Sequence, residues 1–308
     1  MSHYKSKVTA SLYALISISF WGVSFVSTKA VLEKLDPFSI IVLRFGIGAL
    51  FLLLLLVIKR IRLFVSITYL PHLIILGILG VFVHQILQAT ALLTINASSA
   101  GWLISLSPIF TVILSILFLN EKMTITKATG MVLAITGVLL VTSTRSGHSF
   151  QFSINIGFLL MILSTLNWAV YSVIFKSLRI PYSPLLVTFY MSLIGLVLTT
   201  PFIMRSKGWE SLSLLDHTEW AHLLFLGVFV SGIAYWYWGK ALKVLEASKV
   251  SMFLYLEPVS TLIAAVLLLQ EKVLFISVAG GIIIIIGVII VNGQLVPQLF
   301  SLFKNKRP

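Results

Sequence analysis

The chain has 308 residues, of which 59% are hydrophobic and only 10% are charged. A soluble domain carries about 25% charged residues, so this composition excludes an ordinary water-soluble fold. The formal net charge is +13, but the basic residues lie singly beside apolar segments, as in loops that face a membrane rather than in a nucleic-acid-binding surface. The chain has no cysteine, which excludes disulfides and thiolate metal sites.

Apolar runs of about 20 residues recur along the whole chain, and each is long enough to cross a hydrocarbon core of about 30 Å. Since lipid offers no hydrogen bonds, each crossing must satisfy its own backbone, as an α-helix does. We therefore predict an all-α integral membrane protein with ten transmembrane helices, at residues 9–31, 38–58, 71–93, 97–119, 124–143, 155–176, 183–203, 220–241, 247–269 and 274–293. The first run lacks a small-residue cleavage site and is too long for a signal peptide, so we expect it to be retained.

The basic residues predict the orientation of these helices. If the N-terminus is cytoplasmic, the inner loops and ends receive fifteen lysines and arginines, whereas the outer ones receive six. This positive-inside bias predicts that both termini are cytoplasmic. Residues 294–308 then form a basic cytoplasmic tail.

An internal repeat organises the chain. Residues 91–141 and 241–291 match without a gap at 17 of 51 positions. The most informative matches are Ala97/Ala247, Ser98/Ser248, Pro108/Pro258, Thr111/Thr261, Glu121/Glu271, Lys122/Lys272, Gly130/Gly280 and Gly137/Gly287. Each half, at 9–143 and 155–293, holds five predicted helices, an odd number, so the second half must enter the membrane from the opposite side. Inverted repeats of this kind are typical of secondary transporters, whose site lies near the midplane between the halves.

Several short motifs occur in a fixed order around this repeat. They are FWGVSF at 20–25, Pro37 followed by LRF at 43–45, NEK at 120–122, LEPV at 256–259 and QEK at 270–272. Through them the chain resembles the EamA type of the drug/metabolite transporter superfamily, from about Ala10 to Asn292. The resemblance implies a carrier in the bacterial cytoplasmic membrane that works by alternating access and often exports amino acids or other small metabolites. We expect a small-molecule substrate and no cofactor, metal or nucleic acid.

Polar and aromatic residues recur at helical spacing inside the predicted spans, where they are costly unless they face a cavity or one another. They predict a central, mostly neutral and aromatic cavity for an organic molecule. The candidate substrate-binding residues are Trp21, Ser24, Arg44, His84, Gln88, Trp102, Asn167, Trp168, Tyr171, Tyr235 and Tyr255. The alternative is that the aromatic residues form interfacial belts and that the small residues serve close helix packing.

Two charged residues lie deep in predicted spans. Arg44 could bind a substrate carboxylate as a bidentate fork, or it could form a structural pair. Glu257 is our candidate for proton coupling, and its alternative role is to pair with Arg44 or with an amide freed by Pro258. His84 could contact substrate or simply bond a neighbour. The prolines Pro108 and Pro258, in equivalent helices, are the predicted hinges.

Other repeated residues favour structural roles. Glu121 and Glu271 each precede a predicted helix, whose dipole stabilises a carboxylate at that position. The glycines at 130, 137, 280 and 287 are spaced for close helix packing. The sequence has no HExxH, GxSxG or phosphate-cradling glycine-rich motif, so we expect no enzyme. A channel remains the other alternative, although it would require like polar groups along one continuous pore.

Overall fold

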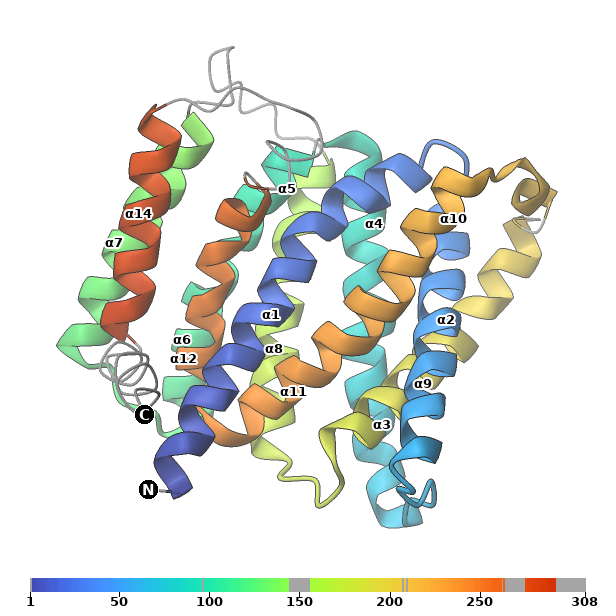
Figure 1. Cartoon of the computed structure of the whole chain (residues 1–308), viewed down its shortest axis with the longest axis horizontal. Helices are drawn as coiled ribbons and strands as arrows, with labels where there is room; N and C mark the ends of the chain where they lie inside the picture. Colours follow the sequence, from blue (N-terminus) through green and yellow to red (C-terminus); the bar gives the residue numbers. More distant parts are fainter. Residues whose placement is uncertain are drawn as a thin grey trace, which may run out of the picture.

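The computed structural model describes residues 2–95, 97–143, 156–206, 208, 210–261, 263 and 275–291. Within these ranges every regular element is a helix (Figure 1). The elements are α1 (Ser2–Val31), α2 (Pro37–Ile58), η1 (Ile67–Tyr69), α3 (Leu70–Gly77), η2 (Ile78–Val83), α4 (His84–Thr94), α5 (Ala97–Ile104), α6 (Ser107–Leu119), α7 (Ile125–Ser143), α8 (Ile156–Ser177), α9 (Pro184–Ser206), η3 (Glu210–Leu214), α10 (His217–Leu224), η4 (Phe225–Ala234), α11 (Tyr235–Val244), α12 (Ala247–Ser251), η5 (Met252–Leu256) and α14 (Phe275–Val291).

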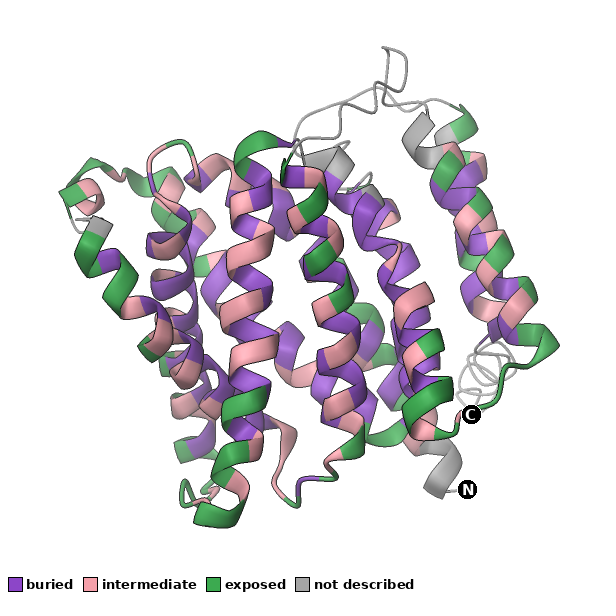
Figure 2. Cartoon of the chain, turned by 180° about the vertical axis from the view of Figure 1, so that it is seen from behind, coloured by how far each residue is buried: buried purple, intermediate pink, exposed green. Residues whose placement is uncertain are grey.

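Six helices are long and apolar enough to cross a membrane: Ser6–Val31, Pro37–Ile58, Ile67–Thr94, Ile156–Ser177, Pro184–Arg205 and His217–Val244. Three shorter apolar helices, at Ser107–Leu119, Ile125–Leu140 and Val278–Val291, accompany them. Figure 2 shows buried residues on the helix faces that meet one another and exposed residues on the outward faces. Exposed Leu50, Leu54 and Leu117 show that these outward faces are apolar, as a lipid-facing surface requires. The number of ten helices and the cytoplasmic termini stay predictions.

Local sequence fixes where the helices begin. The Asp36 carboxylate accepts hydrogen bonds from the backbone N–H groups of Phe38 (2.9 Å) and Ser39 (3.1 Å), and Pro37 occupies the first turn of α2. Helix α10 begins in the same way, with a reciprocal capping box between Asp216 and Glu219. These caps satisfy backbone donors that would otherwise face the membrane boundary unpaired.

The repeat is visible in the distortions of the helices. The compound helices Ile67–Thr94 and His217–Val244 begin and end 150 positions apart. Each contains a π-helical segment at an equivalent place, η2 (Ile78–Val83) in the first and η4 (Phe225–Ala234) in the second. Such segments are rare and collect at functional sites, so both halves carry the same distortion at an equivalent place.

The predicted close packing of the repeated glycines is confirmed. Helices α7 and α14 lie antiparallel and side by side (Figure 1). A Cβ on Gly130 would lie 2.5 Å from the Gly287 carbonyl oxygen, and a Cβ on Gly137 would lie 2.5 Å from the Gly280 carbonyl oxygen. Exchanging the two halves exchanges these two contacts, which is the mark of a two-fold relation between them.

This packing predicts a stability defect in Gly137→Ala. The added methyl group would collide with backbone rather than with a flexible side chain, and overpacking of this kind destabilises by about 1–3 kcal/mol. We expect thermal unfolding of the purified protein at a lower temperature than wild type. The matched control is Gly281→Ala, whose Cβ would lie 3.8 Å from Val259 Cγ2, an ordinary contact. Equal melting temperatures of the two variants would contradict the prediction.

Candidate functional site

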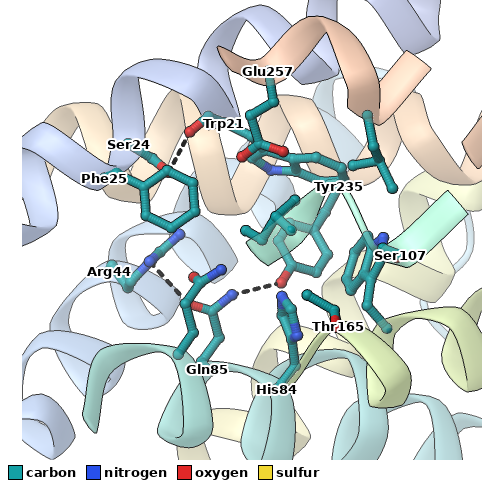
Figure 3. Close-up of a pocket in the computed structure, with 14 residues that line it drawn as sticks. Trp21, Ser24, Phe25, Arg44, His84, Gln85, Ser107, Thr165, Tyr235 and Glu257 are labelled. Carbon is teal, nitrogen blue, oxygen red and sulfur yellow. Dashed lines mark hydrogen bonds between the residues drawn. The ribbon is translucent and has the colours of Figure 1, made fainter. Parts of the chain in front are cut away.

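A central pocket lies where the two halves meet (Figure 3). It is lined by Trp21, Ser24, Phe25, Arg44, His84, Gln85, Gln88, Ile104, Ser107, Thr165, Trp168, Tyr235, Leu254 and Glu257. The space between these side chains totals about 430 Å³ with its opening included, but only about 30 Å³ of it is open to the centres of water-sized molecules. That is room for a few water molecules, so the structure holds the pocket in a contracted state.

Three aromatic rings form its wall. The Trp21 and Trp168 ring centroids are 5.1 Å apart in an edge-to-face arrangement. The Tyr235 ring lies 5.6 Å from Trp21 and 5.5 Å from Trp168. These are favourable aromatic geometries, and they leave a polarisable apolar surface that faces the pocket.

The repeat places equivalent residues of the two halves in the aromatic wall. Trp21 and Trp168 are 147 positions apart, the same spacing as between Pro37 and Pro184, which begin α2 and α9. Gln85 and Tyr235 are 150 positions apart, and the Gln85 Nε2 donates a 2.9 Å hydrogen bond to the Tyr235 hydroxyl. Equivalent residues of the two halves touch only near the axis that relates them. The pocket therefore lies on the pseudo-two-fold axis, where inverted-repeat transporters place their sites.

Arg44 lies in this pocket with only 3% of its surface exposed. Its Nε donates to the Ser231 hydroxyl at 3.0 Å, and its Nη1 donates to Gln85 Oε1 at 2.9 Å. Within the part of the chain that the structure describes, no carboxylate lies within ion-pair distance of the guanidinium. A guanidinium has five N–H donors, so several remain available to a ligand.

Glu257 enters the same pocket from the end of η5 and is 2% exposed. Its carboxylate has no hydrogen bond or ion pair with any described residue, so the pairing with Arg44 considered above is absent. The Trp168 indole N–H and the Ser107 hydroxyl are also buried and without a partner among the described residues. Buried polar groups are normally satisfied, and three unsatisfied ones around one pocket indicate a place for a polar ligand.

His84 is held by its neighbours, as the alternative interpretation proposed. Its Nδ1 lies 2.9 Å from the Ser164 hydroxyl, and its ring centroid lies 4.7 Å from that of Trp168. The ring nevertheless lines the pocket. His84 thus fixes the position of Trp168 while it remains within reach of a ligand.

The pocket brings together most of the predicted site residues: Trp21, Ser24, Arg44, His84, Gln88, Trp168, Tyr235 and Glu257. Three others lie outside it. Asn167 donates to the Leu79 carbonyl at 2.7 Å, Tyr171 points its hydroxyl at Met191 Sδ (3.8 Å), and Tyr255 is fully buried away from the lining. The side chain of Trp102 lies outside the described residues.

Six lining residues were not predicted: Phe25, Gln85, Ile104, Ser107, Thr165 and Leu254. Two of them carried a signal in the repeat, since Gln85 is equivalent to Tyr235 and Ser107 is equivalent to Glu257. Pro108 follows the interruption between α5 and α6, and Pro258 follows η5. Their role as hinges stays a prediction. No group of three metal-ligating side chains occurs among the described residues.

Figure 1 marks the end of the molecule at which the N-terminus lies, here called the N-terminal face. Charged side chains join neighbouring helices at this face. The Glu121 carboxylate accepts hydrogen bonds from the backbone N–H groups of Ala247 (2.8 Å) and Ser248 (3.2 Å), and from the Ser248 hydroxyl. The Lys127 ammonium lies 2.6 Å from Glu246 and 3.7 Å from Glu121. We call these five residues the N-face network, and it joins the α6–α7 turn to the start of α12.

The network corrects one expectation and has an electrostatic consequence. The dipole of the following helix was expected to stabilise the Glu121 carboxylate, but this carboxylate instead accepts hydrogen bonds from the start of α12, in the other half of the chain. Partial burial favours the neutral form of Glu246, but hydrogen bonds from Lys127 and Lys249 outweigh it and hold the Glu246 pKa below its ordinary value. Glu246 is therefore charged at neutral pH.

Comparison with known proteins agrees with this architecture. The model of the EamA-like transporter family matches residues 8–143 and 155–293. An uncharacterized transporter of Archaeoglobus fulgidus is 32% identical over 280 residues, which cover 90% of this chain and 96% of the relative. The uncharacterized transporter YyaM of Bacillus subtilis is 29% identical over 89% of this chain and 90% of its own.

A protein of known crystal structure shares the fold, with a TM-score of 0.77 at 20% identity over 92% of this chain and 98% of that one. The repeated halves, the site on their axis and these similarities agree with one another. The chain belongs to the EamA-like transporter family and is a multi-pass transporter of the cell membrane.

Proposed function

We propose that this transporter exports small zwitterionic metabolites, best represented by amino acids with apolar or aromatic side chains, in exchange for protons. The observation that carries the proposal is that a buried guanidinium, that of Arg44, and a buried carboxyl group, that of Glu257, face one aromatic pocket without pairing with each other. A zwitterion supplies the missing partner of each.

The repeat favours a ligand role for these two charges. The position equivalent to Arg44 is Met191, and the position equivalent to Glu257 is Ser107. A role in packing the two halves together would call for similar residues at equivalent positions, as Trp21 and Trp168 are. Arg44 and Glu257 each occur in only one half. The pocket is therefore asymmetric in its ionisable groups, although the helices around it follow the repeat.

The chemistry of the lining fits such a substrate. The guanidinium of Arg44 can hold a carboxylate through two parallel hydrogen bonds. The carboxylate of Glu257 can accept hydrogen bonds from an ammonium group, while Trp21 and Trp168 provide faces for an apolar or aromatic side chain. The free N–H of Trp168 and the hydroxyl of Ser107 add two further hydrogen bonds.

Glu257 also supplies a means of coupling. One carboxylate can bind an ammonium or a proton but not both, so protonation and substrate binding oppose each other, and by linkage each weakens the other equally. A carrier that can change its open side only with substrate or a proton bound exchanges substrate for protons. In a cell whose outside is more acidic than its cytoplasm, this exchange moves the substrate outward.

Alternating access is supported by the contracted pocket and the N-face network. About 30 Å³ of free space cannot hold a metabolite, since ligand pockets usually span about 300–1,000 Å³. The helices around the pocket must therefore separate for loading. Inverted repeats supply two nearly equivalent packings for this motion, and the N-face network stabilises the one in which the N-terminal face is closed.

The test of transport is counterflow in proteoliposomes with a panel of labelled amino acids, nucleosides and sugars. We expect saturable exchange of amino acids with apolar side chains, and its loss in Trp168→Ala. The matched control is Trp220→Ala, which removes an exposed indole that does not line the pocket. Exchange that is equally fast for all classes, or equal in both tryptophan variants, would refute the proposal.

The N-face network makes a separate prediction. Removing the charge of Glu121 in Glu121→Gln weakens hydrogen bonds to a charged group, each worth about 1.5–3 kcal/mol. We expect the N-terminal face to open more often, by about tenfold. Because the chain has no cysteine, a single Ser251→Cys reporter, buried behind the network, can be labelled with a membrane-impermeant thiol reagent. Labelling should accelerate in Glu121→Gln but not in the exposed control Glu210→Gln, and equal rates would contradict the prediction.

A further inference from the structure

A second cavity lies at the N-terminal face, between the ends of α8 and α11 and the start of α9. About 440 Å³ of it is open to the centres of water-sized molecules, far more than in the central pocket. Its lining shares no residue with that pocket. It is therefore a preformed space separate from the central pocket.

The polar part of its lining is entirely basic, from Lys176, Arg179 and Lys243. The Lys176 ammonium donates to the carbonyls of Leu242 (2.8 Å) and Leu245 (2.6 Å). The Lys243 ammonium donates to the carbonyls of Ile180 (3.1 Å) and Tyr182. An ammonium has three donors, so each lysine keeps one for a further partner.

Arg179 is the most available of the three. Its side chain is exposed, and it makes no hydrogen bond or ion pair with any described residue. The acidic side chains that act on Lys176 are Glu121 and Glu246, and both already bind Lys127 in the N-face network. No acidic residue lines the cavity, so the charge of its lining is positive.

The other half of the lining is apolar, from Phe175, Ile180, Val187 and Leu242. We propose that this cavity binds an anionic phospholipid, with its phosphate against the three cations and the start of its acyl chains against the apolar side. The cavity lies where two membrane-crossing helices end, which is the level of the lipid headgroups. The positive-inside bias predicts that this face is cytoplasmic, where anionic lipids attract basic residues.

The apolar lining favours a lipid over a soluble ion. Inorganic phosphate would use the cations and gain nothing from the apolar side of the cavity. A lipid satisfies both halves of the cavity, because its headgroup and its chains meet at this depth. Inorganic phosphate has the same charged group, so the experiment must distinguish it from a lipid.

The test is native mass spectrometry of the full chain in detergent, titrated with a short-chain phosphatidylglycerol, with the matching phosphatidylcholine and with inorganic phosphate. We expect the phosphatidylglycerol adduct to form at lower concentration than the phosphatidylcholine adduct. Arg179→Gln should weaken it about fivefold, because each basic residue near a membrane surface contributes about that factor. Adding Lys243→Gln should weaken it about fivefold further.

The matched control is Arg60→Gln. Like Arg179, Arg60 is an exposed arginine with a positive φ (51° against 45°) just after a helix end, but it does not line the cavity. Its adduct should form as in wild type. Because Lys243 also holds backbone carbonyls, the single Arg179→Gln variant keeps the test valid if the double variant folds poorly. Equal binding of both lipids, an unchanged Arg179→Gln adduct, or displacement by equimolar phosphate would overturn the proposal.

Discussion

Replacing Arg44 with glutamine is expected to raise the substrate concentration for half-maximal counterflow by about 10- to 100-fold. Hydrogen bonds to a charged group contribute about 1.5–3 kcal/mol, and each 1.4 kcal/mol is a factor of ten in affinity. Arg44→Lys should fall between wild type and glutamine, since lysine keeps the charge but loses the planar fork. The measurement is the concentration dependence of amino-acid exchange in proteoliposomes.

A structural role for Arg44 would give a different pattern. Arg44 also holds Ser231 and Gln85, so its loss could disturb the pocket as a whole. If it recognises a carboxylate, Arg44→Gln should weaken binding of an amino acid but not of the amine that lacks the carboxylate. The control for surface charge is Arg60→Gln, which should bind both as wild type does. Equal weakening of both ligands in Arg44→Gln would contradict carboxylate recognition.

Replacing Glu257 with glutamine is expected to abolish uphill transport driven by a pH gradient while exchange at saturating substrate continues. Glutamine has nearly the same shape and can still accept a hydrogen bond from an ammonium, but it cannot take up a proton. A gradient of one pH unit stores about 1.4 kcal/mol per proton, enough for about tenfold accumulation in wild type. The variant should show no accumulation above the equilibrium level.

The control for this prediction is Glu33→Gln, which removes an exposed carboxylate outside the pocket. Its accumulation should match that of wild type. If Glu257→Gln still accumulates substrate tenfold under the same gradient, the proton binds elsewhere. If it loses exchange as well as accumulation, the expected separation of exchange from coupling is wrong.

Apolar run length and residue spacing predicted the helices well, because each membrane-crossing segment must itself be long and apolar enough to span the hydrocarbon core. The interruptions inside the helices were not predictable in the same way. The π-helical segments η2 and η4 and the break between α5 and α6 contain no residue that forces them, apart from Pro108 beside the break. Apolar run length and residue spacing therefore gave no sign of them.

A site residue was predictable where it lay both on the helix face that points to the pocket and at the level of the pocket along the helix. Trp21 and Trp168 satisfy both conditions and lie at the same level of the two halves. Tyr171 shares a face with Trp168 but lies one turn further along α8, where its ring packs 4.7 Å from that of Trp168 and not in the lining. Helical spacing gives direction around an axis but not depth, so this kind of error is expected.

Long-range partners were the least predictable feature. Glu121 and its partners Ala247 and Ser248 are more than 120 positions apart, and nothing near Glu121 indicates a bond to the other half. The repeat itself held part of this information, since it showed that Glu121 and Ser248 belong to motifs that occur in both halves.

The central claim is that Arg44 and Glu257 recognise the two charges of one substrate. Counterflow by the wild-type protein, with an exchanged amino acid compared with its decarboxylated amine and its deaminated acid, tests this most directly. The account predicts that the amino acid drives exchange at concentrations about tenfold or more below those needed for either analogue, because each analogue leaves one buried charge unpaired. Exchange of the amine or the acid as efficient as that of the amino acid would contradict it.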